Sequence, residues 1–180
     1  MNIDKRLEQK IGFDRIRQII SDRCSTEYAA ERTATECFST DLSVIRKRLL
    51  LTDEMRLIMM FEDSFPSGGF IDCIGFLKPL EMSSSAIDLI SIRKLRTMLD
   101  TLRKVTSFFN GVKDEVYPNL KRMASPIMGF PEVQRRIDLI IDRYGEVKDT
   151  ASNELYEIRK SLRDKEGAIS RRMSAILKKA

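Results

Sequence analysis

The sequence predicts an all-α fold, a bundle of several helices followed by one long C-terminal helix that begins a coiled coil. Three observations support this. Apolar residues recur at helical intervals along nearly the whole chain. The two strand-like passages, residues 70–71 and 146–147, are too short to found a sheet. With 180 residues, 42% of them hydrophobic, the chain can bury a core without a disulfide or a metal.

Two helices are predicted in the N-terminal part, over residues 4–10 and 14–34. The second is expected to kink near Cys24 and Ser25. A longer helix is predicted over residues 41–62, with Thr40 as its candidate cap. It should end before residues 65–69, because the proline there has no backbone N–H to donate and the two glycines make the backbone flexible.

The next long helix is predicted over residues 86–110, where apolar and charged side chains fill opposite faces. Ser84 or Ser85 can cap its start, and Asp88 favours the positive end of the helix dipole. Shorter helices should follow over residues 114–123 and 132–142. Pro131 has the backbone angle that suits the first turn of the last of these.

The last predicted helix runs from about Asn153 to the end of the chain, with Ser152 as its cap. It carries four apolar residues spaced seven apart, which is one seam of a coiled coil: Leu155, Leu162, Ile169 and Ile176. The complementary seam is poor, because only its first member is apolar: Ile158, Lys165 and Arg172. No glycine or proline ends this helix, so we expect it to belong to a longer one.

Histidine is absent, which excludes serine and cysteine nucleophile systems that need an imidazole, and imidazole metal sites. Adjacent carboxylates occur at positions 53–54, 62–63 and 114–115, but neighbours on a helix diverge by about 100° and are expected on solvated faces. We therefore predict no catalytic residue, no metal ligand and no cofactor-binding residue. Cys24, Cys37 and Cys73 form no paired motif and are expected to be buried thiols in a reducing compartment.

Patterns for nucleotide binding and for membrane insertion are also missing. The glycines never form a Walker A loop, and Gly68 and Gly69 are expected to be a flexible connection. No apolar run long enough to span a membrane and no signal-peptide pattern is visible. We expect a soluble, cytoplasmic protein.

The net charge of the chain, +5, is concentrated in its last helix. Residues 156–180 hold eight basic and three acidic side chains, and the other residues hold 24 of each. A basic helix on a neutral body suits contact with a phosphate backbone. The candidate contacts are Arg159, Lys160, Arg163, Arg171, Arg172, Lys178 and Lys179. The alternative is a solvated helix whose charge is offset by an acidic partner helix.

Three passages carry a resemblance to a known family. Residues 7–17 read LEQKIGFDRIR, residues 51–56 read LTDEMR, and residues 141–159 read IDRYGEVKDTASNELYEIR. The chain resembles the N-terminal region of the MutS-II branch of bacterial MutS-type ATPases. In that family the third passage is the turn that leads from the helical core into the coiled-coil clamp.

The resemblance implies two domains, the first half of a helical core and lever over residues 1–150 and the start of the clamp helix over 151–180. It implies a parent protein that is a homodimeric ATPase, using ATP and magnesium, with a possible C-terminal Smr nuclease domain. Such a protein would embrace branched DNA in suppressing recombination, or stalled ribosomes and their RNA in ribosome rescue. This chain would be a non-enzymatic part of it. The alternative is a helical scaffold or dimerisation module whose basic arm binds an acidic protein.

Overall fold

The computed structural model describes residues 5–82 and 86–178, and in these ranges it contains helices and no strand. The prediction of an all-α fold is confirmed. The chain divides into two compact units, Met1–Gly129 and Phe130–Ala180. The boundary predicted at residue 150 stays a prediction.

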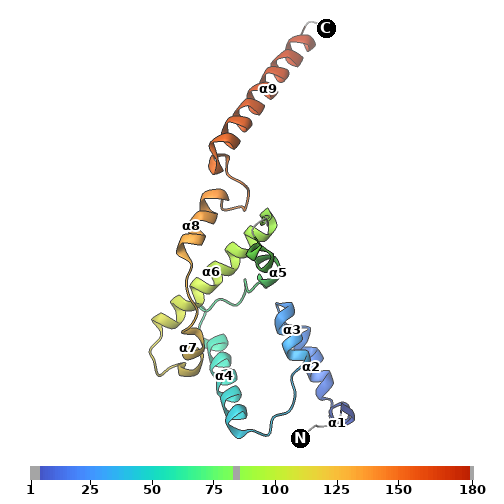
Figure 1. Ribbon diagram of the computed structural model, residues 1–180, viewed down its shortest axis with the longest axis vertical. Coiled ribbons are helices and arrows are strands. Elements are labelled where there is room, and N and C mark those ends of the chain that lie inside the picture. Colours follow the sequence, from blue (N-terminus) through green and yellow to red (C-terminus); the bar gives the residue numbers. More distant parts are fainter. Residues whose placement is uncertain (1–4, 83–85, 179–180) are drawn as a thin grey trace. The chain divides into compact units, whose positions relative to one another are not determined.

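The first unit opens with three short helices, α1 (Lys5–Lys10), α2 (Phe13–Ser21) and α3 (Glu27–Ala34) (Figure 1). The single kinked helix predicted over residues 14–34 is wrong, because the chain breaks completely between α2 and α3, which pack on each other. The Oγ1 atom of Thr26 accepts the amide of Ala29 at 3.2 Å and starts α3 anew. Beside them, Phe13 stacks on Phe38 with ring centroids 4.4 Å apart.

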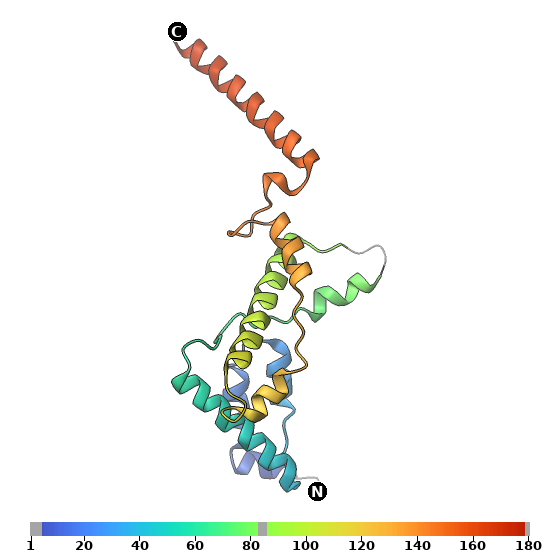
Figure 2. The same ribbon diagram turned by 90° about the vertical axis from the view of Figure 1, so that its left-hand side faces the viewer.

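The core of the first unit lies among α4 (Leu42–Phe61), α6 (Leu89–Gly111) and α7 (Pro118–Ala124), and α7 contacts both longer helices (Figures 1 and 2). Its buried members come from all three helices and the turn before α7: Ile58, Val105, Phe108, Phe109, Tyr117, Leu120 and Ala124. The predicted helix over 114–123 begins later than expected, because Pro118 starts its first turn.

Two predicted caps are corrected by the structure. Asp41, not Thr40, caps α4, and its carboxylate accepts the amides of Ser43 and Val44 at 2.8 and 3.2 Å. Asp88 caps α6 by accepting the amide of Ser91 at 2.9 Å. Ser84 and Ser85, the caps predicted for this helix, lie outside the described residues.

Between α4 and α6 the chain forms α5 (Ile74–Leu77) and the 3₁₀ turn η1 (Lys78–Glu81), neither of which was predicted. The cysteine prediction holds only in part, since Cys73 is buried but Cys37 is exposed and Cys24 is half-buried. No helix in the described residues combines the length and the apolar character that a membrane crossing requires.

The second unit consists of α8 (Pro131–Ile140), the 3₁₀ turn η2 (Asp149–Ala151) and α9 (Asn153–Leu177). A hairpin turn connects α8 to η2, and an isolated antiparallel bridge joins Ile141 to Val147 across it. The predicted cap of the last helix is confirmed, because the Oγ atom of Ser152 accepts the amide of Leu155 at 3.1 Å.

Candidate nucleic-acid interface

Five of the predicted basic residues lie on α9 and Lys178 is its C-cap, but the structure gives them different roles. Arg159 and Arg163 face the start of the helix, where both contact Asp149 of η2. One Oδ atom of Asp149 accepts a hydrogen bond from Nη1 of Arg159 at 2.6 Å, and the other accepts one from Nη1 of Arg163 at 2.9 Å. Arg159 also donates to the carbonyl of Val147 at 2.9 Å. These two arginines therefore fasten the preceding turn onto α9.

Three other basic residues share one side of this segment, two of them on α9 and the third, Lys178, at its C-cap. Lys160, Arg171 and Lys178 are 11 and 7 residues apart, which places them within about 20° of one another on a regular helix. All three are exposed. The apolar seam lies on the opposite side of the helix, at about 180° from them. Arg172 lies beside the seam, and Lys179 is outside the described residues.

The seam itself is uncovered in the described chain. Leu162, Ile169 and Ile176 are each more than half exposed, and Ile158 and Met173 beside them are exposed as well. Only Leu155, near the cap, is half-buried. The uncovered apolar stripe of α9 suits packing against another helix. The basic stripe on the opposite side suits binding of an anion.

The hairpin turn at 141–147 fixes how α9 leaves α8. Asp142 Oδ1 accepts the amides of Tyr144 and Glu146 at 2.8 and 2.9 Å. Both hydrogen bonds lower the pKa of the Asp142 carboxyl, and the bond from the Glu146 amide has the larger effect. Gly145 adopts the left-handed conformation, with φ of 81°, that closes the turn. Ile141 anchors it from below with 1% of its surface exposed.

Asp149 is the functional residue that the sequence analysis missed. Nothing in its spacing from Arg159, ten positions later and across a capped helix start, distinguishes it from the acidic residues around it. Only the direction in which α9 leaves η2 brings the three charges together.

The hydrogen bonds from Arg159 and then Arg163 hold the pKa of Asp149 below its usual value. A lowered pKa means that the ion pairs stabilise the folded turn fully above about pH 4, the ordinary carboxyl pKa, and lose this effect as the pH falls further. Asp149→Asn should remove the effect at neutral pH. We expect weaker protection of the amides at residues 147–151 against hydrogen exchange at neutral pH. As the pH falls, protection relative to the intrinsic exchange rate should fall in the unchanged chain but not further in this variant.

Asp164→Asn provides the control for this variant, because Asp164 is an exposed carboxylate on the same helix. Its amide exchange pattern near η2 should match that of the unchanged chain. Equal acceleration in both variants, or none in Asp149→Asn, would contradict the role given to Asp149.

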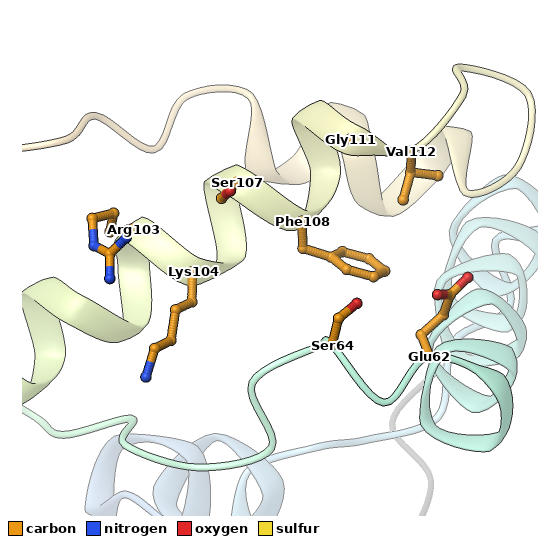
Figure 3. A pocket seen from close by; sticks show the side chains of 8 residues that line it. All are labelled: Glu62, Ser64, Arg103, Lys104, Ser107, Phe108, Gly111 and Val112. Carbon is orange, nitrogen blue, oxygen red and sulfur yellow. The ribbon is translucent and has the colours of Figure 1, made fainter.

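In the first unit, a hollow of about 440 Å³ lies between the end of α4 and α6, and Figure 3 shows its lining. Arg103 and Lys104 project from α6 on one side, and Glu62 lies on the other with Phe108 between. Both cations are paired with Asp100, at 2.6 and 2.8 Å. Glu62 accepts the Tyr117 hydroxyl at 3.1 Å. Since the fold already uses these charges, we assign no ligand to the hollow.

The acidic pairs of the sequence are not all solvated, which corrects one expectation. Asp53 is exposed and pairs with Arg56, but its neighbour Glu54 is buried against α7. Asp114 pairs with Lys121 at 2.6 Å. In the described part of the chain no three cysteine, aspartate or glutamate side chains converge as metal ligands would.

No protein-family model matches the chain. It is similar to proteins named Endonuclease MutS2, with 26% identity over 179 residues to that of Listeria monocytogenes strain HCC23 and 28% over 172 residues to that of Thermomicrobium roseum. These matches cover 98% and 93% of this chain, but only 22% and 21% of the relatives. The chain thus spans about a fifth of their length. The predicted resemblance to the MutS-II branch is confirmed.

Proposed function

We propose that this chain is a helical core and clamp-base segment of a MutS-type DNA-binding ATPase, and that its basic helix makes sequence-independent contacts with nucleic acid. The observation that carries the proposal is the similarity to MutS2 over almost the whole chain, combined with the exposed basic residues Lys160 and Arg171 on one side of α9. We also propose that the parent protein is a homodimer that binds ATP and magnesium outside this chain. Its proposed roles are on branched DNA, in suppressing recombination, and on stalled ribosomes.

The surface of α4 supports a place inside a larger helical core. One side of this helix contributes Ile58 to the buried core, and Leu51 and Met55 pack beside it. The other sides also carry apolar residues, and those are exposed: Leu42, Leu49, Leu50, Met59, Met60 and Phe61. A helix with large apolar side chains on several sides is normally covered on more than one of them. A second half of the core, as in the MutS-II family, would cover it.

The face shared by Lys160 and Arg171 supports the nucleic-acid contact. Neither residue forms an ion pair that holds it to another described element, unlike Arg159 and Arg163, so both can approach a phosphate. A regular helix presents such side chains in line, which suits the repeated charges of a backbone but reads no base sequence.

The test is a titration of a branched DNA with the chain at several salt concentrations. The double variant Lys160→Glu, Arg171→Glu should bind more weakly, and the slope of log affinity against log salt should become shallower by roughly 2, about 0.9 per lost phosphate contact. Circular dichroism should show the same helix content, since both residues are exposed.

The matched control is Arg46→Glu, Lys47→Glu, the same charge change at exposed positions of α4. If it weakens binding as much as the α9 variant, overall charge rather than the α9 face explains the affinity. Binding that does not depend on salt contradicts the proposed contact. The scaffold alternative would also account for the uncovered seam of α9, as a surface for a second helix. A stable dimer in light scattering that binds no nucleic acid would favour this alternative.

A further inference from the structure

The tip of the hairpin turn between α8 and α9 carries an exposed aromatic ring. Tyr144 is 71% exposed, more than any other aromatic side chain in the described residues. The guanidinium carbon of Arg143 lies 4.7 Å from the ring centroid, in a cation–π contact. The cation covers one face of the ring, and the high exposure leaves the other face accessible.

Hydrogen bonds order the backbone of the turn that carries this ring. Besides the two amides that Asp142 accepts, the backbone amide of Asp142 donates to the carbonyl of Glu146 at 2.9 Å. Lys148 closes the base of the hairpin, with its amide 2.9 Å from the carbonyl of Ile140. Because this backbone is already ordered, stacking on the ring costs less conformational entropy than it would on a disordered loop.

The second unit carries a net positive charge, which suits a nucleic-acid backbone as it would any acidic surface. Residues 130–180 hold twelve basic and nine acidic side chains. Of the acidic residues in and next to the turn, Asp142 accepts backbone amides and Asp149 pairs with Arg159 and Arg163, while the side chain of Glu146 is exposed. The cation of Arg143 and the ring of Tyr144 lie together at the exposed tip, the combination with which proteins bind single-stranded nucleic acid. The ring is the feature that favours this partner over an acidic protein surface.

We propose that Tyr144 is a stacking platform for an unpaired nucleobase, with Arg143 supporting the ring and facing the adjoining phosphate. The inference rests on the proposed function, since it names a substrate feature that the same unit would recognise. Branched nucleic acids expose unpaired bases where strands separate, whereas a blunt duplex offers such a base only at its ends. Stacking tolerates any base, so no sequence preference is expected.

The probe is a single-stranded oligonucleotide with one 2-aminopurine, whose fluorescence falls when the base stacks. Tyr144→Ala in the full 180-residue chain should weaken binding to it about tenfold and abolish the quenching. Tyr144→Phe keeps the ring and should stay within about twofold of the unchanged chain. Tyr144→Ala should change binding to a blunt duplex much less, because its bases are paired except at the ends.

Tyr28→Ala is the matched control, because Tyr28 is an exposed tyrosine of α3 in the first unit, and it should have no effect. An unchanged affinity and quenching in Tyr144→Ala overturns the stacking platform, as does an equal loss on the duplex and the single strand. If the charge variant of α9 still weakens binding in that case, the proposed function survives alone. If the unchanged chain binds none of these probes at low salt, both proposals fail.

Discussion

Glu54→Ala is expected to lower the free energy of unfolding by about 3 kcal/mol, because it removes a buried carboxylate that accepts three hydrogen bonds. Its oxygens accept the amides of Asn119 and Leu120 at 3.1 and 2.7 Å, and the side-chain amide of Asn119 at 2.6 Å. These amides belong to the first turn of α7, where no residue of the helix itself supplies a cap. A carboxylate from α4 therefore takes the part of an N-cap.

Chemical denaturation followed by circular dichroism measures this prediction. Glu54→Gln should cost less, roughly 1 to 2 kcal/mol, because an amide oxygen can still accept but carries no charge. Asp53→Ala is the matched control. Asp53 is exposed and pairs only with Arg56 one turn away, so its loss should change stability by less than about 0.5 kcal/mol. A Glu54→Ala variant as stable as Asp53→Ala would show that α7 does not depend on this contact.

Glu54 also shows what the sequence could not reveal. Its partners lie 65 and 66 positions further along the chain, and no local pattern links the two passages. By contrast, Ser152 accepts the amide of a residue three positions later, which is why the start of α9 could be predicted. Caps that act within one turn can be predicted from sequence, whereas caps donated from another helix depend on packing.

Where two capping residues stand side by side, the predicted cap is the wrong one. Thr40 and Asp41 are both good N-caps, but the carboxylate of Asp41 reaches two amides as well as the hydroxyl of Ser43. The break between α2 and α3 was missed for a similar reason. The apolar spacing continues across it, and only the bond from Ala29 to Thr26 marks the new start.

The candidate interface was predictable as a set of residues but not as a set of roles. The concentration of charge in residues 156–180 identified the helix. It could not show that Arg159 and Arg163 are held by Asp149 while Lys160 and Arg171 face outward, because that division depends on the turn at η2. The exposed ring of Tyr144 gave no signal either, since one tyrosine in a turn is unremarkable until its exposure is known.

Gly69→Ala is expected to lower the free energy of unfolding by about 3 kcal/mol, for two reasons that add. Gly69 has φ of 84°, where an alanine side chain costs about 1 to 2 kcal/mol. A Cβ atom there would also lie 2.3 Å from Oγ1 of Thr101 on α6. Thr101 is 4% exposed, and its hydroxyl lies 3.1 Å from the Gly69 carbonyl and 3.0 Å from that of Thr97. Rotating it away would lose these contacts.

The neighbouring glycine provides the control for this variant. Gly68 has no positive φ, and a Cβ there meets nothing within 4 Å, so Gly68→Ala should change stability by less than about 0.5 kcal/mol. Adding Thr101→Ala to Gly69→Ala removes the clash but not the backbone strain. A double-mutant cycle should therefore recover about 1 kcal/mol of the loss and leave the rest. Additive effects would mean that the close approach of the loop to α6 costs nothing, and that the strain at Gly69 alone sets the requirement for glycine.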